Sequence, residues 1–145
     1  ATAVNTPTAT ATATDSHAND LFAVQSGSPV FLTNFAHPTE ACAWAGVAGQ
    51  IFSSAGLPLT DYIVKLEGTY NGAALDMISV TGIVANNPYG PGSFEFVLGN
   101  TAVDSQNLIT IQLFDPNGVE VTSPYTLNTS SSCSQNLQII NFKQK

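Results

Sequence analysis

Apolar and polar residues alternate in short runs along most of the chain, and this period of two predicts β-strands. In residues 62–67, for example, Tyr62, Val64 and Leu66 share one face of the expected strand. No segment has the 3.6-residue periodicity of an amphipathic helix. The strands predicted in this way cover residues 21–24, 30–35, 43–52, 62–67, 75–84, 94–98, 109–113, 119–122 and 137–142. The pattern therefore predicts an all-β fold, an antiparallel β-sandwich of about seven to eight strands.

Glycine and proline mark special points within this pattern. Gly46 and Gly49 lie inside the long strand predicted at residues 43–52, which indicates a bulge or a close approach of another backbone. The stretch from Asp115 to Gly118 combines Pro, which fixes φ, with Gly, which supplies a positive φ, and this predicts a tight turn.

The first 20 residues differ from the rest because they carry almost no large side chains. Such a segment buries too little apolar area to offset its ordering entropy, which favours a flexible or O-glycosylated stalk. Alternating Thr and Ala also fit an extended strand that pairs with an available sheet edge. We therefore divide the chain into an extension, residues 1–25, and a sandwich, residues 26–145. The candidate inserting residues are Thr8, Ala9, Thr10, Ala11, Thr12, Ala13, Thr14, Leu21, Phe22 and Val24.

The composition narrows the possible partners. Charged residues make up 9% of the chain, and the net charge is −7 with only three Lys or Arg residues. Few basic side chains are available to neutralise phosphates or anionic headgroups, so we expect neither nucleic-acid binding nor membrane association. No run approaches the about 20 apolar residues that cross a bilayer. The chain begins at Ala1 and is rich in neutral polar residues. From these two features we expect a mature extracellular or cell-surface protein.

The chain contains two cysteines, Cys42 and Cys133. In a protein of an oxidising compartment they are expected to form a disulfide that joins the first long strand to the last. The alternative is a pair of free buried thiols. Trp44 lies two residues after Cys42, where its ring could either cover the sulfurs or belong to the ordinary core.

Catalytic and metal-binding motifs are not evident. His17 lies in the tail and His37 in a turn, and neither has a neighbour at metal-ligand spacing. The chain has no nucleophile elbow, phosphate-binding glycine loop or zinc-protease motif. We expect no enzyme activity, no cofactor and no metal.

Three further features have more ordinary explanations. Asp115 and Glu120 could contribute to a Ca²⁺ loop, but a hairpin turn explains them better. Lys65 could form an isopeptide crosslink, but a surface pair with Glu67 is the favoured interpretation. Asn128 begins a formal N-glycosylation sequon in a polar loop.

Two stretches, residues 46–59 and 63–66, carry a resemblance to a known family. They resemble the opening hairpin of carboxypeptidase-regulatory-like, or transthyretin-like, β-sandwich domains, with Ser53 where that family usually has Asp. Over residues 30–145 the frame around Cys42 and Cys133 is similar to repeated domains of secreted bacterial surface proteins with Thr-rich stalks. The resemblance implies the fold. It leaves the function open, because such sandwiches serve as stalks, adhesins, carbohydrate-binding modules and filament subunits.

The tail and the sandwich together favour a structural function. We expect a subunit of an extracellular, pilus-like filament in which the tail of one copy adds a β-strand to the next copy. The alternative is a cell-surface adhesion or carbohydrate-binding module that binds surface glycans, with Tyr70 and Tyr89 as its aromatic platform.

Overall fold

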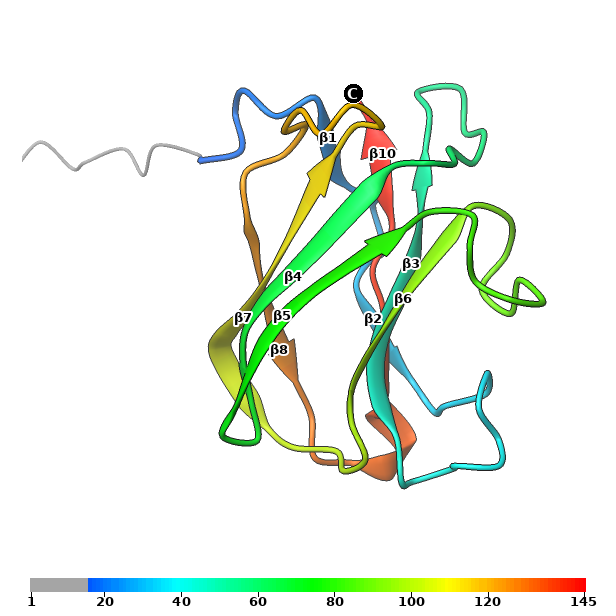
Figure 1. Cartoon of the computed structure of the whole chain (residues 1–145), viewed down its shortest axis with the longest axis vertical. Helices are drawn as coiled ribbons and strands as arrows, with labels where there is room; N and C mark the ends of the chain where they lie inside the picture. Colours follow the sequence, from blue (N-terminus) through cyan, green and yellow to red (C-terminus); the bar gives the residue numbers. More distant parts are fainter. Residues whose placement is uncertain (1–15) are drawn as a thin grey trace, which may run out of the picture.

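The computed structural model describes residues 16–145, which fold into two facing β-sheets (Figure 1). The predicted all-β sandwich is confirmed, although residues 16–145 form ten strands rather than the expected seven to eight. The first sheet contains β1 (Phe22–Val24), β2 (Val30–Leu32), β3 (Ala45–Phe52), β6 (Ser93–Gly99), β9 (Leu137–Ile139) and β10 (Phe142–Gln144). The second contains β4 (Ile63–Tyr70), β5 (Ala73–Val80), β7 (Ser105–Phe114) and β8 (Tyr125–Thr129), in the order β5-β4-β7-β8. A short 3₁₀ helix, η1 (Cys133–Gln135), precedes β9.

Strand β3 is the centre of the first sheet. It pairs with β6 on one side and with β9 and then β10 on the other, both parallel to it. Strands β2 and β1 add outside β9 and β10, respectively. The single terminal strand predicted at residues 137–142 is therefore two strands. At the break, the Ser28 hydroxyl accepts the Asn141 amide proton at 2.8 Å and donates to the Ile139 carbonyl at 3.2 Å.

The inner faces of the two sheets form the main core. In β4, Val64 and Leu66 are fully buried, as the alternation predicts, and Tyr62 packs against the same core from just before the strand. The other large side chains that are almost fully buried include Phe22, Ile51, Phe94, Ile109, Ile111, Leu113, Ile140 and Phe142. These residues come from strands of both sheets, so the core is shared by the whole sandwich.

The connection from β3 to β4 differs from the expected hairpin. The two strands lie in different sheets, and only the isolated bridge between Phe52 and Pro58 resembles hairpin pairing. Ser53 still caps the turn, because its hydroxyl accepts the Leu57 amide proton at 3.1 Å. The hairpin interpretation was wrong because β6, β9 and β10 already occupy both sides of β3. The chain therefore crosses to the second sheet as an arch.

The sandwich begins earlier than residue 26. Strand β1 pairs antiparallel with β10, and Phe22 is only 1% exposed within the core. The Leu21 amide donates to the Val121 carbonyl at 2.9 Å. Of the candidate tail residues, Leu21, Phe22 and Val24 thus lie in the sandwich itself, whereas Thr8–Thr14 lie outside the described residues.

Both glycines of β3 act as the sequence predicts. The register shifts between Ala45 and Gly46, and a Cβ at Gly46 would overlap the Trp44 ring. Trp44 packs over this glycine and against the His37 ring. At Gly49 the Ile140 backbone approaches so closely that a Cβ would overlap the Ile140 carbonyl oxygen.

Gly49→Ala should therefore destabilise the sandwich by about 1–3 kcal/mol, the usual cost of overpacking a tight site. Urea denaturation measures this difference. Gly99→Ala is the matched control, because its Cβ would lie 3.4 Å from the Tyr70 ring, an ordinary contact. Equal losses in the two variants would contradict the steric explanation.

The structure has the predicted disulfide, between Cys42 and Cys133, whose Cα atoms are 5.2 Å apart. It joins the loop before β3 to η1, and both cysteines lie near the surface. Trp44 contacts Gly46 and His37, as described above, and belongs to a small second cluster with Ala48 and Leu137 on the outer side of the first sheet.

Replacing both cysteines by serine should lower the free energy of unfolding by up to about 4 kcal/mol, because a 91-residue separation leaves a large unfolded loop unconstrained. Equilibrium urea unfolding of the double variant and of the oxidised wild type measures the difference. An unchanged free energy of unfolding would show that the bond does not constrain the unfolded chain.

Candidate functional site

Strand β2 is an exposed apolar edge. Val30, Phe31 and Leu32 are 41%, 36% and 41% exposed, and β9 is the strand that pairs with β2 among residues 16–145. The register places Val30 opposite Ile139 and Leu32 opposite Leu137, so these four side chains share the outer face of the sheet. β-branched and aromatic residues explain why this segment is extended. The free side of β2 is open to another strand.

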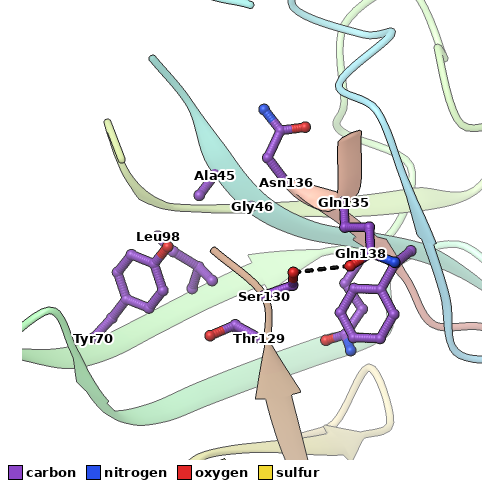
Figure 2. A pocket seen from close by; sticks show the side chains of 10 residues that line it. Ala45, Gly46, Tyr70, Leu98, Thr129, Ser130, Gln135, Asn136 and Gln138 are labelled. Atoms are coloured by element: carbon purple, nitrogen blue, oxygen red, sulfur yellow. Dashed lines mark hydrogen bonds between the residues drawn. The ribbon is translucent and has the colours of Figure 1, made fainter. Parts of the chain in front are cut away.

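The space under β2 is too small for an inserted strand. Figure 2 shows this pocket, where Tyr70, Leu98 and Gln138 converge. Its volume is about 10 Å³, about the room needed for a single water. Within it, the Gln138 amide nitrogen donates to the Asn128 carbonyl, while its amide oxygen has no hydrogen-bond partner among residues 16–145. The core is therefore complete here, and an added strand must lie beside β2 rather than inside the sandwich.

Tyr70 is not part of an exposed aromatic platform. It is 3% exposed, its hydroxyl donates to the Thr101 carbonyl at 2.7 Å, and it accepts the Val103 amide proton at 2.9 Å. Burial raises the pKa of this phenol. Tyr70 thus fixes the β6–β7 connection, and that part of the platform interpretation was wrong.

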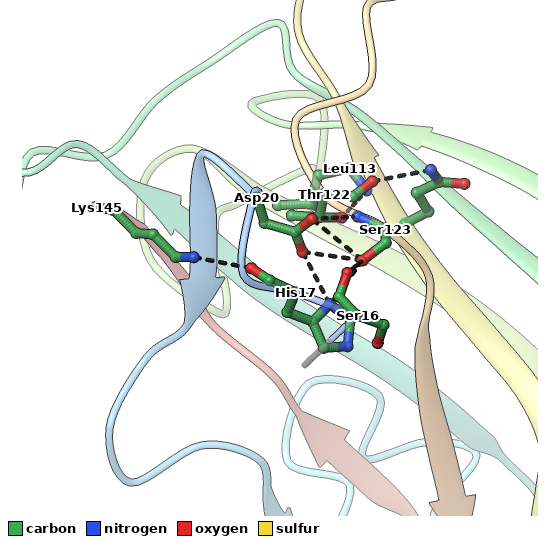
Figure 3. A network of polar contacts seen from close by, with 8 residues as sticks. Ser16, His17, Asp20, Leu113, Thr122, Ser123 and Lys145 are labelled. Carbon is green, nitrogen blue, oxygen red and sulfur yellow. Dashed lines mark hydrogen bonds and ion pairs between the residues drawn. The ribbon is translucent and has the colours of Figure 1, made fainter. Parts of the chain in front are cut away.

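A polar network holds the point where the tail joins the sandwich (Figure 3). The Asp20 carboxylate accepts the Ser123 amide proton at 2.9 Å and lies 2.8 Å from His17 Nδ1. The His17 ring stacks on Tyr125 with centroids 3.7 Å apart, and Lys145 Nζ donates to the His17 carbonyl at 3.0 Å. We call these five residues the tail clasp. Sequence reasoning missed it because Ser123 is 103 residues from Asp20.

The tail clasp contains Ser, His and Asp but does not have the geometry of a catalytic triad. His17 Nδ1 lies 2.8 Å from both Asp20 Oδ2 and Ser123 Oγ. A proton relay requires the carboxylate at one ring nitrogen and the serine at the other. The Ser123 hydroxyl is also within 2.9 Å of the Ser16 carbonyl. The arrangement is therefore suited to fastening the chain, not to activating a nucleophile.

The neighbours of Asp20 lower the pKa of its carboxyl group. Burial alone would raise its pKa, but hydrogen bonds from Ser123 and His17 and the charge of His17 outweigh it, so the pKa lies below the ordinary 3.8. The folded state therefore holds Asp20 ionised more firmly than the unfolded state does.

A second polar cluster lies on the outer side of the first sheet. His37 Nε2 is 2.8 Å from Glu95 Oε2, and the Tyr89 hydroxyl donates to the same oxygen. Burial, with the hydrogen bond to Glu95 and its charge, raises the pKa of Tyr89, so the phenol keeps its proton. The His37 ring stacks on Trp44 with centroids 4.9 Å apart. The sequence predicts only a turn at His37 and not its contact with Glu95, which is 58 residues away.

Buried asparagines hold this loop in place. Asn34 Oδ1 accepts the His37 amide proton at 2.9 Å, and Asn34 Nδ2 donates to the His37 carbonyl at 2.8 Å. The backbone amide of Asn34 in turn donates to Asn136 Oδ1 at 2.8 Å. Two buried Asn side chains thus connect the loop to β9.

The remaining candidates have simple environments. Lys65 Nζ is 2.7 Å from Glu67 Oε1 in a surface pair. Asp115 Oδ1 accepts amide protons from Asn117 and Val119 at 2.9 Å, as a turn requires. Asn128 lies in β8 rather than in the predicted loop, and its Oδ1 accepts the Asn107 amide proton.

Neither a membrane helix nor a metal cluster is found in the described part of the chain. Over residues 16–145 no helix is long and apolar enough to cross a bilayer. The same residues contain no group of three His, Cys, Asp or Glu side chains that could hold a metal ion.

Comparisons with known proteins give little guidance. No family model and no curated protein matches the chain. Among solved structures, a dioxygenase domain from a "novel dioxygenase carbohydrate-binding protein fusion" of the cellulolytic bacterium Streptomyces sp. SirexAA-E has a TM-score of 0.36 and 16% identity. That match covers 70% of this chain and 78% of the other. The likeness is too small to support a functional argument, and the family resemblance stays a prediction.

The depressed pKa of Asp20 predicts acid sensitivity at the tail clasp. Its contribution to stability should be complete above the ordinary carboxyl pKa of 3.8 and be lost as the pH falls below it through the lower folded value. Asp20→Asn should flatten this part of the stability profile, measured as unfolding temperature against pH. Asp61→Asn, which keeps a residue suited to φ 66°, is the control. The same acid slope in Asp20→Asn and wild type would contradict the prediction.

Proposed function

We propose that this protein is a structural subunit of an extracellular filament, in which residues 1–15 of one copy add as a β-strand along β2 of the next copy. The observation that carries the proposal is the open edge of β2, with its three exposed apolar side chains.

Edges of this kind are normally protected in proteins that stay monomeric. Charged side chains, bulges or covering loops prevent edge strands from pairing with other chains. β2 has no charged residue, and what protects it is its length of three residues and Pro29 just before it. A partner strand would bury Val30 and Leu32 and pair the free backbone groups, as in β-strand addition.

The sequence of the tail suits this edge. Residues 1–14 contain no charged side chain, and Thr and Ala alternate from Thr8 to Thr14. In an extended strand the methyl groups of Ala would lie on one face, toward the apolar side chains of β2, and Thr on the other. Asp15 is the first charged side chain, and it lies two residues before His17 of the tail clasp.

The two halves of the proposed contact lie at different ends of the sandwich. The tail clasp joins the tail to the end that carries the C-terminus (Figure 1). β2 leads toward η1 at the other end, where Thr33 Oγ1 donates to the Ser134 carbonyl. Fifteen extended residues reach at most about 50 Å, enough to run along a neighbouring sandwich. A head-to-tail contact of this type propagates into an open filament.

An extracellular location agrees with the chemistry of the chain. The Cys42–Cys133 disulfide persists best in an oxidising compartment. The low content of charged residues lets copies approach each other with few unpaired charges to bury.

The first test compares the full chain with a chain that begins at Ser16. Sedimentation velocity and negative-stain microscopy should show polymers of the full chain and monomers of the shortened one, because the shortened chain lacks the added strand. Polymers formed equally well by the shortened chain, or a full chain that stays monomeric across a wide concentration range, would overturn the proposal.

Edge variants then locate the acceptor. Val30→Lys with Leu32→Lys should abolish polymers, because two charges would face the incoming strand. Leu57→Lys is the matched control, since Leu57 is 65% exposed in the β3–β4 connection, away from both sheet edges. Ile78→Lys tests an edge of the second sheet, β5. Loss of polymers with Ile78→Lys but not with the β2 variant would refute β2 as the acceptor.

A further inference from the structure

The outer side of the first sheet contains a hollow of about 280 Å³ that belongs to neither the core nor the β2 edge. It lies between the loop that carries His37 and the loop between β5 and β6. Its lining residues are Ala36, His37, Val84, Ala85, Asn86, Pro88 and Glu95. The hollow thus combines a carboxylate, an imidazole and an amide with small apolar walls.

The three polar side chains have hydrogen-bonding capacity left over. Both bonds to Glu95 end on Oε2, so Oε1 accepts no hydrogen bond from residues 16–145, although the side chain is only 17% exposed. His37 is bonded through Nε2, which leaves Nδ1 without a partner in the same part of the chain. The Asn86 side chain makes no hydrogen bond there either. A half-buried carboxylate oxygen favours a ligand that brings a donor.

We propose that this hollow binds one unit of a neutral saccharide. Sugar hydroxyls both donate and accept, which matches a carboxylate oxygen, an imidazole nitrogen and an amide in one place. The C–H groups of a pyranose fit the small walls formed by Ala36, Val84 and Pro88. The volume is slightly below the about 300 Å³ at which pockets for drug-sized ligands begin, so it fits a single sugar unit.

An exposed aromatic ring stands beside the hollow. Phe35 is 52% exposed and lies edge-on to Tyr89, with ring centroids 5.7 Å apart. Phe35 directly precedes the lining residues Ala36 and His37, and in the proposed site its ring would pack against a sugar that extends beyond the hollow. Phe35, rather than the predicted Tyr70, supplies the aromatic surface.

Charge and ligand number argue against an anionic ligand and a metal ion. The chain has a net charge of −7, and none of its three lysines lines the hollow, so an acidic sugar or a phosphate would be repelled. A metal ion would need more ligands than the one His and one Glu present here.

Hydrogen bonds and packing hold the His37 and Glu95 side of the site in place before a ligand arrives. Asn34 fixes the backbone of His37, Trp44 supports its ring, and Tyr89 holds Glu95. The disulfide at Cys42 fastens the same loop to η1. A preorganised site loses little freedom on binding, which improves the affinity that a few hydrogen bonds can give.

Trp44 provides the measurement, because it is the single tryptophan of the chain and lies against His37. The full chain is titrated with glucose, galactose, mannose, N-acetylglucosamine and glucuronic acid while Trp44 fluorescence is recorded, with calorimetry as a second readout. At least one neutral sugar should bind with a millimolar dissociation constant, and glucuronic acid should bind at least tenfold more weakly.

Variants assign the binding to the hollow. Glu95→Gln should weaken binding of that sugar by about tenfold or more, and Phe35→Ala should weaken it by about threefold to tenfold. Glu120→Gln, which changes a carboxylate in the β7–β8 connection, should leave the affinity unchanged. Asn86→Gly removes the amide but accepts the φ of 64°, so it tests the site even if Glu95→Gln folds poorly. No response to any neutral sugar, stronger binding of glucuronic acid, or unchanged affinity in the Phe35 and Asn86 variants would overturn the proposal.

Sugar binding in the hollow should not depend on filament formation. The hollow and β2 use different residues, so the Val30→Lys/Leu32→Lys variant should bind the sugar as wild type does. Sugar binding that disappears only when β2 is changed would show that the ligand occupies the edge and not the hollow.

Discussion

The saturated pairing of β3 is the constraint on which the rest of the molecule depends. β6 lies along one side of it, and β9 and β10 share the other. The sharing is possible because Gly49 leaves room for the Ile140 backbone, which crosses closely at that point and shifts the chain from β9 to β10. With both sides filled, β4 must cross to the second sheet, and the inner faces of two sheets can close on one core.

The same break determines the N-terminal edge. Because β9 and β10 are separate, the strand outside them is also divided, into β1 and β2, with the Ser28 hydroxyl bonded at the junction. β1 is anchored by Phe22 in the core and by the tail clasp. β2 has no such anchor, and its three apolar side chains stay exposed. One local event in the sheet thus produces both an anchored tail and an exposed strand.

Local patterns were enough to predict most strands, the turn at Asp115, the close approach at Gly49 and the disulfide between Cys42 and Cys133. The strands, the turn and the close approach depend on residues that are neighbours in sequence. The disulfide depends on cysteine, whose usual role in an oxidising compartment is to form such a bond. The arch after β3 was missed because pairing partners, not the turn sequence, decide which sheet a strand joins. The two histidine clusters were missed for a related reason. Ser123 and Glu95 reach His17 and His37 from distant parts of the chain, and no spacing rule identifies such contacts.

In the proposed filament, the tail clasp has a mechanical consequence. A pull on the tail reaches the sandwich first at His17 and Asp20, which are bonded to Lys145 and Ser123. It then reaches β1, whose Leu21–Lys145 and β10 hydrogen bonds run across the direction of the strand. Hydrogen bonds that lie across the pulling direction share the force and must break together. If the strand were pulled away from its neighbour sideways, they would break one at a time. The anchor of the tail is therefore part of the folded core, and tension between copies would be carried by the sheet that also presents β2.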